Sequence, residues 1–233
     1  MHVLKNAIVA AGAFALAAVG VTSVAAAGDY NGDFMVRAGV SVVIPDTDAK
    51  VYGDGDYLGP TYDADINTKW IPSATLTYFF TPNLAAELFC CFSKHDVKGK
   101  GALEGADLGD TWIFPPIVTL QYHFTGLGRI KPYVGAGVQW IHFFNEGRSP
   151  DLAGKLALDD AFGFALQAGV DIEIGGGWYL NADVKKSFID ADAKWKGTDP
   201  AITADVDIDP WIISANVGYR FNLFGPRYTE PLK

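Results

Sequence analysis

Beyond residue 33, apolar and polar residues alternate in eight separate segments of the chain. These segments are 34–43, 70–80, 84–93, 117–124, 131–144, 162–174, 178–189 and 208–221. Alternation with a period of two is typical of a β-strand, because successive side chains point to opposite faces. The connections also alternate, with short ones at 81–83, 125–130 and 175–177 and long ones at 44–69, 94–116, 145–161 and 190–207. Short turns at one end and long loops at the other predict an all-β fold, an eight-stranded antiparallel up-and-down transmembrane β-barrel.

Aromatic residues mark the short-turn end of this predicted barrel. Three strands end in a Tyr-x-Phe pair, namely Tyr78 and Phe80, Tyr122 and Phe124, and Tyr219 and Phe221. Both rings of a pair lie on one face, and that face continues into aliphatic residues, so it predicts a lipid-facing surface with an aromatic belt. The alternative is a soluble barrel whose apolar face points inward. That arrangement would leave Gln121, His123 and Arg220 in water while large aromatic residues crowd one end.

The opposite face of the strands must then line the lumen, and near the short turns it is polar. The predicted polar lumen plug consists of Arg37, Glu87, Gln121, His123, Asp171, Glu173, Asp183, Lys185 and Arg220. A barrel of eight strands is only wide enough for its side chains to fill it or to hold one small ligand. We therefore expect the opposed charges to pair across the lumen and close it to water.

Towards the long loops the same inward face is apolar. The predicted hydrophobic lumen, a cup for a ligand, consists of Val43, Ile71, Phe89, Ile117, Ile141, Phe143, Ile189, Ile208 and Ile212. An apolar solute could lose its water there and, finding charges below, leave sideways through the wall. The consecutive Pro115 and Pro116 lack two backbone donors and could leave a lateral gap, although proline at a strand start is also ordinary. The alternative for the cup is that its residues simply pack as a core.

The first residues resemble an export signal. Lys5 precedes an apolar, alanine-rich run from Ala7 to Val24, and Ala25-Ala26-Ala27 offers the small residues of a cleavage site. We predict a cleavable signal peptide at 1–27, an outer-membrane β-barrel domain at 28–233 and a location in the bacterial outer membrane. The alternative for this run is an uncleaved membrane anchor.

Composition and charge exclude several other classes. The 233 residues are 49% hydrophobic and carry a formal net charge of −9 without a basic cluster, so nucleic acid is not an expected partner. No metal or other cofactor is expected, since the acidic stretch from Asp46 to Asp65 does not follow the spacing of a calcium loop, and adjacent Cys90 and Cys91 have no metal-site spacing. Ser93, His95 and Asp96 show no orienting third group, so we predict that the protein is not an enzyme.

Four motifs together resemble the OmpW family of outer-membrane proteins. They are KPYVGAGV at 131–138, Pro115-Pro116 ahead of Thr119-x-Gln121-Tyr122-x-Phe124, PNLAAE at 82–87, and the ending from Asp209-Pro210-Trp211 to Gly218-Tyr219-Arg220-Phe221. The resemblance covers the mature chain. It implies an eight-stranded outer-membrane barrel with a narrow hydrophobic channel for uptake of small hydrophobic molecules and lateral release into the membrane. The tail from Asn222 to Lys233 departs from it, since such barrels commonly end at the aromatic residue that the assembly machinery reads.

Two classes of function stay open. In the first, the protein transports small hydrophobic solutes, and its partners are those solutes, the outer-membrane lipids and the barrel assembly machinery. In the second, it is a structural or receptor-like surface barrel whose interior is packed and whose loops bind partners. Bound solute in the cup, with loss of uptake on deletion, would favour the first class.

Overall fold

In the computed structural model, residues 33–151 and 154–222 are described, and they form fifteen β-strands. The strands are β1 (Phe34–Ile44), β2 (Asp48–Gly53), β3 (Asp56–Tyr57), β4 (Tyr62–Ile66), β5 (Lys69–Phe79), β6 (Leu84–Cys90), β7 (Ser93–Gly101), β8 (Asp107–Phe114), β9 (Ile117–His123), β10 (Ile130–Phe144), β11 (Lys155–Leu158), β12 (Ala161–Gly175), β13 (Trp178–Lys196), β14 (Ile202–Asp207) and β15 (Trp211–Phe221). Within those ranges no helix has the length and apolar character needed to cross a membrane. The predicted signal peptide at 1–27 and the tail beyond Asn222 lie outside the described residues.

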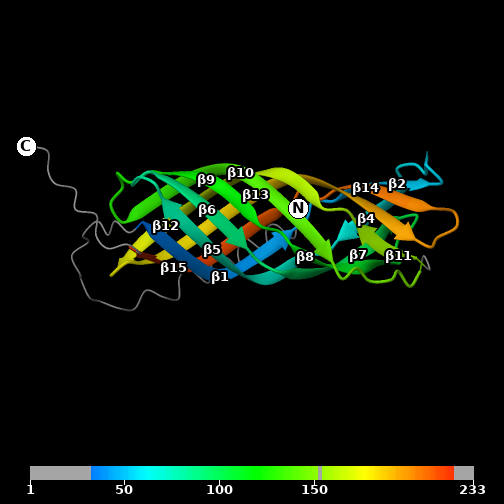
Figure 1. The fold of residues 1–233 in the computed structure, drawn as a ribbon, viewed down its shortest axis with the longest axis horizontal. Coiled ribbons are helices and arrows are strands. Elements are labelled where there is room, and N and C mark those ends of the chain that lie inside the picture. Colours follow the sequence, from blue (N-terminus) through cyan, green and yellow to red (C-terminus); the bar gives the residue numbers. More distant parts are fainter. Residues whose placement is uncertain (1–32, 152–153, 223–233) are drawn as a thin grey trace, which may run out of the picture.

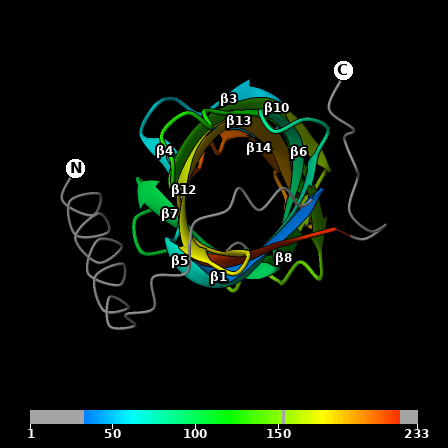
Figure 2. The ribbon, with the colours of Figure 1, turned by 90° about the vertical axis from the view of Figure 1, so that its left-hand side faces the viewer.

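Eight of these strands close into an antiparallel barrel, as predicted. Going round the wall, β1, β5, β6, β9, β10, β12, β13 and β15 each pair with the next. The ring closes where β15 pairs with β1, from Phe34 opposite Phe221 to Ile44 opposite Trp211. Figure 2 shows the strands as a continuous ring. Closure leaves no open edge in the wall of the lower barrel.

The predicted long loops are wrong as loops, because most of their residues form further strands. These strands and the far ends of β10 and β13 build an extension beyond the barrel, seen on the right of Figure 1. One sheet contains β3, β2, β14, β13 and β11, and the other contains β4, β7, β8 and β10. The physical reason is that alternation continues past the predicted boundary. In β13, Ala191, Ala193 and Trp195 are buried, and the Asp and Lys residues between them are exposed.

Two predicted boundaries also differ from the structure. The predicted strand 84–93 is divided, because β6 ends at Cys90 and β7 begins at Ser93. The predicted strand 208–221 begins only at Trp211, because Asp209 has a positive φ of 32° and Pro210 follows it. Both divisions separate a barrel strand from a strand of the extension.

The outer face of the barrel is apolar at both ends and between them. Leu120 is 54% exposed and Val138 63%, which is the surface expected of side chains that face acyl chains. Aromatic contacts connect the lower belt: the Phe34 and Tyr78 rings lie 5.0 Å apart, and those of Trp178 and Tyr219 lie 4.9 Å apart. A second set of exposed aromatic residues lies at the opposite strand ends. It comprises Trp70, Phe92, Phe162 and Trp211.

Candidate functional site

Arg37 is the centre of the polar plug. The side chain comes from β1 and is 1% exposed. Its Nε donates to Asp171 Oδ1 at 3.0 Å and its Nη2 to Asp171 Oδ2 at 2.6 Å, a two-bond contact with β12. Its Nη1 donates to Glu87 Oε2 on β6 at 2.8 Å. One guanidinium therefore connects three strands across the lumen, with the fixed geometry that favours paired carboxylates.

Lys185 completes the plug from β13. It forms ion pairs with Asp183 and with Glu87, whose Oε1 lies 3.2 Å from Lys185 Nζ. Gln167 Nε2 donates to Glu87 Oε1 at 2.9 Å and to Asp183 Oδ2 at 2.7 Å. Asp183 Oδ2 also accepts from the hydroxyl of Tyr133 at 2.7 Å. Since these charged groups are buried and each has partners, the network occupies the lumen with side chains.

The remaining predicted plug residues are also buried, around this network. His123 Nε2 lies 2.9 Å from Gln121 Oε1, and Gln121 Nε2 donates to Gln167 Oε1 at 3.0 Å. Glu173 Oε2 lies 3.8 Å from Lys131 Nζ, a residue that the sequence analysis did not assign to the plug. Arg220 lies over the ring of Phe79 at 3.7 Å from its centroid. Below the plug, Met35, Phe79, Ala85 and Tyr179 form a small apolar cluster.

A packed apolar layer contains five of the nine predicted cup residues. Val43, Ile71, Phe89, Ile117 and Ile212 pack with Cys91 and Ala165 in one buried cluster. Of this cluster only Val43, Cys91 and Ile212 also reach the cavity. Ile71, Phe89 and Ile117 therefore pack as core within this layer, as in the alternative in which the cup residues only pack against one another. They separate the polar plug from the space above.

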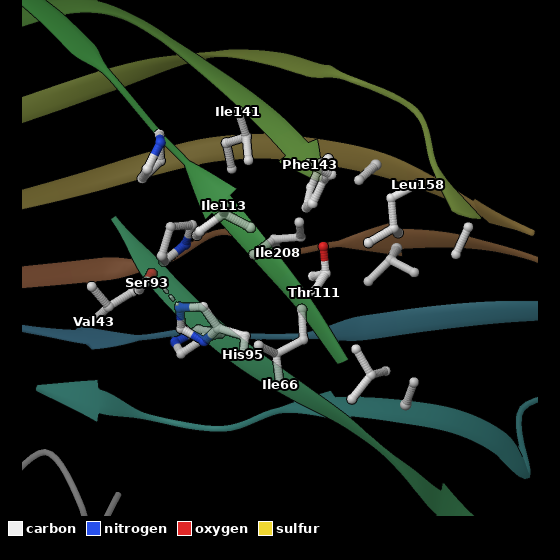
Figure 3. A pocket seen from close by; sticks show the side chains of 18 of the residues that line it. Val43, Ile66, Ser93, His95, Thr111, Ile113, Ile141, Phe143, Leu158 and Ile208 are labelled. Carbon is white, nitrogen blue, oxygen red and sulfur yellow. Dashed lines mark hydrogen bonds between the residues drawn. The ribbon is translucent and has the colours of Figure 1, made fainter. Parts of the chain in front are cut away.

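An apolar cavity lies above this layer and extends into the extension. About 910 Å³ of empty space, part of it open to solvent, lies between its wall atoms. Five predicted residues line it: Val43, Ile141, Phe143, Ile208 and Ile212. Figure 3 shows Ile141, Phe143 and Ile208 grouped around this space with Ile66, Ile113 and Leu158. Ile189, the ninth predicted residue, is buried in the neighbouring cluster of the extension.

The sequence analysis missed the upper wall of the cavity. Strands of the extension supply Ala64, Ile66, Val97, Ile113, Leu156, Leu158, Ala191, Ala193, Trp195 and Val206. The available signal was the period of two in these segments, such as Ile202-x-Ala204-x-Val206-x-Ile208. Small and acidic residues hide it, because alanine contributes little hydrophobicity and aspartate is depleted in strands.

Four polar residues interrupt the apolar wall: Ser93, His95, Thr111 and Gln139. Ser93 Oγ lies 3.0 Å from His95 Nε2, and His95 Nδ1 lies 3.2 Å from the backbone oxygen of Asn67. A carbonyl oxygen can only accept, so Nδ1 carries the proton and Ser93 donates to Nε2. Burial of His95 on β7, in the extension, lowers its pKa, so the imidazole is neutral at pH 7.

This arrangement bears on the predictions about catalysis and metals. The group that orients His95 is the Asn67 carbonyl, whereas Asp96 accepts from Asn67 and Lys69 instead. The acidic stretch from Asp46 to Asp65 runs through β2, β3 and β4. In the part of the chain that the structure describes, no three His, Cys, Asp or Glu side chains are grouped to hold a metal. The absence of enzymatic activity stays a prediction.

The barrel wall contains a gap in its backbone pairing near Pro115 and Pro116. The ladder of β5 with β6 stops at Ala74 opposite Cys90, and that of β6 with β9 stops at Phe89 opposite Ile117. Pairing resumes where Ser93 of β7 lies opposite Ile113 of β8. Cys91 and Phe92 thus lie outside the ladders on both sides. We call Cys91, Phe92, Pro115 and Pro116 the wall gap. The rings of Phe92 and Phe114, 4.8 Å apart, stack beside it.

Comparisons with known proteins agree on one family. The family model described as the OmpW family matches residues 30–221. Outer membrane protein W of Vibrio cholerae is 35% identical over 201 residues, covering 82% of this chain and 89% of that protein. The dibenzothiophene metabolism operon protein PahQ of Pseudomonas aeruginosa is 31% identical over 189 residues, covering 79% of this chain and 87% of its own.

A solved structure gives the same fold. The solid-state NMR structure of outer membrane protein AlkL in DMPC lipid bilayers superposes with a TM-score of 0.66. The sequences are 23% identical, and the alignment covers 89% of this chain and 99% of that one. At this level of identity the similarity establishes the fold, and the location in the outer membrane follows from the named relatives.

Proposed function

Because this chain belongs to the OmpW family of outer-membrane barrels, we propose that it is a channel for small hydrophobic molecules that releases them sideways into the membrane. One observation carries the proposal: an apolar cavity that reaches the extension lies above a lumen filled with ion pairs. PahQ is similar to this chain, and dibenzothiophene, which its name mentions, is an apolar aromatic molecule.

The cavity can supply the driving force for capture. Its wall consists mostly of Ile, Leu, Val, Ala and Phe side chains, so a solute that enters it loses contact with water. Each square ångström of apolar surface removed from water contributes about 25 cal/mol. A two-ring hydrocarbon can therefore be held without any polar contact. The chemistry of the wall selects for hydrophobic solutes as a class.

The plug supports an exit other than the straight path. To pass downward, a solute would have to separate Arg37 from Asp171 and Glu87, and those charges would lose their partners in a buried site. An unpaired buried charge costs several kcal/mol, and an apolar solute forms no hydrogen bond or ion pair with that charge to offset the cost. Movement through the wall avoids this cost.

The wall gap is the proposed exit. At Cys91 and Phe92 no backbone ladder has to be broken for the wall to part, unlike elsewhere in the barrel ring. Cys91 and Pro115 line the cavity, and Phe92 is exposed on the outer face. At this point only one strand separates the cavity from the outer face of the barrel, which supports the wall gap as the exit. Pro115 and Pro116 thus keep the predicted role of a lateral gap in the wall, and Cys91 and Phe92 belong to the same gap.

Uptake by cells tests the proposed function. Cells that lack the gene would receive the wild-type protein, Phe143→Asp or the matched control Phe143→Leu, and uptake of radiolabelled naphthalene would be followed. Phe143 lines the cavity, so a carboxylate there should lower the uptake rate at least fivefold, while leucine should keep it within twofold. The amount of each protein in the outer membrane serves as the control for folding.

The alternative, a structural or receptor-like surface barrel, predicts the opposite result. If uptake is the same with wild type, with Phe143→Asp and without the protein, the channel proposal is overturned, and the apolar space is only the interior of a structural or receptor-like barrel. Direct binding of naphthalene to the purified protein in lipid nanodiscs then separates a cavity that binds but does not transport from one that does neither.

A further inference from the structure

The apolar cavity contains a polar group without a partner. Gln139 is 2% exposed and lines the cavity, and its Oε1 atom has no hydrogen-bond partner among the described residues. Leaving a buried amide oxygen unpaired is unfavourable, because it gives up its hydrogen bonds to water without a replacement. A leucine would fill a similar volume at this position without that cost. The amide is therefore the group in this wall that a bound molecule would satisfy.

A second acceptor comes from the pair Ser93 and His95 on β7. The proton of Ser93 is used in donating to His95 Nε2, as derived above, so the lone pairs of Ser93 Oγ remain available. The hydroxyl of Thr111, directly opposite His95, donates its proton to the backbone oxygen of Trp112 at 3.2 Å, so its lone pairs also remain available. Figure 3 shows the Ser93–His95 hydrogen bond and the Thr111 side chain on this side of the space.

These oxygens require a donor from the ligand. Gln139 Oε1, Ser93 Oγ and Thr111 Oγ1 can each accept a hydrogen bond, and a hydrocarbon, an ether or a ketone has no donor to offer. A charged ammonium group has donors, but the surrounding aliphatic wall would not compensate its loss of water. A neutral hydroxyl fits, since it can donate to one of these oxygens and carries no charge that would have to lose its water.

We propose that the preferred cargo of this cavity is an apolar molecule that carries a hydroxyl group, such as a phenol or a medium-chain alcohol, whose proton is accepted by Gln139 or by Ser93 of the Ser93–His95 pair. This inference rests on the proposed function and specifies its substrate class. The apolar wall binds the body of the molecule, and the polar groups distinguish it from the parent hydrocarbon.

Three ligands that share one ring system test the inference. Binding of naphthalene, 2-naphthol and 2-methoxynaphthalene would be measured with the full protein in lipid nanodiscs, with partition into empty nanodiscs subtracted. One net hydrogen bond corresponds to about a two- to tenfold gain in affinity, so 2-naphthol should exceed naphthalene by that factor. The methoxy compound has no donor and should bind like naphthalene.

Variants then assign the preference to the proposed residues. At least one of the two variants, Gln139→Leu and the double variant Ser93→Ala/His95→Phe, should lower the ratio of 2-naphthol to naphthalene affinity at least twofold while naphthalene still binds. The matched control is Thr75→Val, because Thr75 is also buried with an unpartnered hydroxyl but does not line the cavity. This control should keep the wild-type ratio.

The outcomes separate the inference from the proposed function. If naphthalene and 2-naphthol both fail to bind the wild-type protein, the proposed function is overturned. If both bind equally, or if the methoxy compound matches 2-naphthol, the hydroxyl inference is overturned and the proposed function stands. A wild-type ratio in both Gln139→Leu and Ser93→Ala/His95→Phe also overturns the inference.

Discussion

Arg37 holds two carboxylates in the lumen, and neither of them can reach water from its position. Asp171 and Glu87 are buried together with Arg37, so each charge depends on its neighbours for stabilisation. Removing one partner of a buried pair is more harmful than removing both, because the remaining charge keeps the full cost of desolvation.

Arg37→Met should therefore lower the free energy of unfolding by about 3–5 kcal/mol. Urea unfolding in lipid nanodiscs, followed by tryptophan fluorescence, would measure it. Lys196→Met is the matched control, since Lys196 is an exposed residue of the extension. A loss below 1 kcal/mol in Arg37→Met would contradict the assignment of Arg37 as the centre of the plug.

His95 gives the cavity a dependence on pH. Burial lowers its pKa, opposed in part by the hydrogen bond to the Asn67 carbonyl. The groups around it are Ser93, Thr111, Lys69 and Asp96. A histidine whose pKa is lowered by folding stabilises the folded state above its ordinary pKa near 6.5 and loses that contribution as pH falls below it.

Lowering the pH from 7.5 to 5 should thus destabilise the extension through this residue. Thermal unfolding at several pH values would show it as the difference between wild type and His95→Phe. The comparison removes the contribution of other titrating groups, which both proteins share. Identical pH profiles for the two proteins would refute the role of His95.

For the strands, the sequence predicted which residues face the lumen, but it did not predict how far each strand extends. The inward position of Arg37, Asp171 and Phe143 follows from strand parity, which a period of two fixes along the whole strand. The continuation of β13 to Lys196 was missed, because Ala191 and Ala193 are too small to mark a buried face by hydrophobicity. Ion pairs between particular strands depend on register, which sequence alternation alone does not determine.

The site could be predicted only in part for the same reason. Parity placed Ile71, Phe89 and Ile117 in the apolar interior, but it could not distinguish a packed layer from a cavity wall. That distinction depends on the sizes of side chains from all the strands at one level. Gln139 carried no local signal, since a single glutamine on an inward face is as compatible with a hydrogen-bonded network as with an unpaired amide.

The wall gap can be tested by replacing the two prolines between β8 and β9. Replacing Pro115 and Pro116 by valine would restore two backbone donors, and because Pro115 lies opposite Cys91 in the shared register of the two ladders, pairing could continue from β6–β9 into β7–β8. We expect uptake of naphthalene to fall at least threefold and the amides of this segment to exchange more slowly with deuterium.

Pro132→Val is the matched control for the prolines. Pro132 lies in β10, where the ladder to β12 is continuous, so valine there should leave uptake unchanged. If uptake with Pro115→Val/Pro116→Val equals that of wild type while the amides become protected, release through the wall gap is refuted.

For the whole molecule, the filled lumen leaves no straight aqueous path through the barrel. Arg37, Lys185 and their carboxylates form the plug between the packed apolar layer and the lower apolar cluster. A hydrated sugar would have to break this network and then cross an apolar layer.

Liposomes that contain the protein should therefore swell in an arabinose gradient no faster than protein-free liposomes. Light scattering measures the rate, with a general porin as the positive control. Swelling at a rate that rises with the amount of protein would show an open aqueous path and would contradict a closed plug.

The length of β13 determines how far the protein extends beyond the membrane-spanning barrel. Its 19 residues are about twice the 9–11 that a tilted strand needs to cross a membrane. The surplus therefore projects beyond the membrane-spanning part of the barrel. Under the proposed function, a greasy compound that enters this projecting part would be shielded from any hydrated layer that covers the membrane, so the benefit of the protein should depend on how thick that layer is.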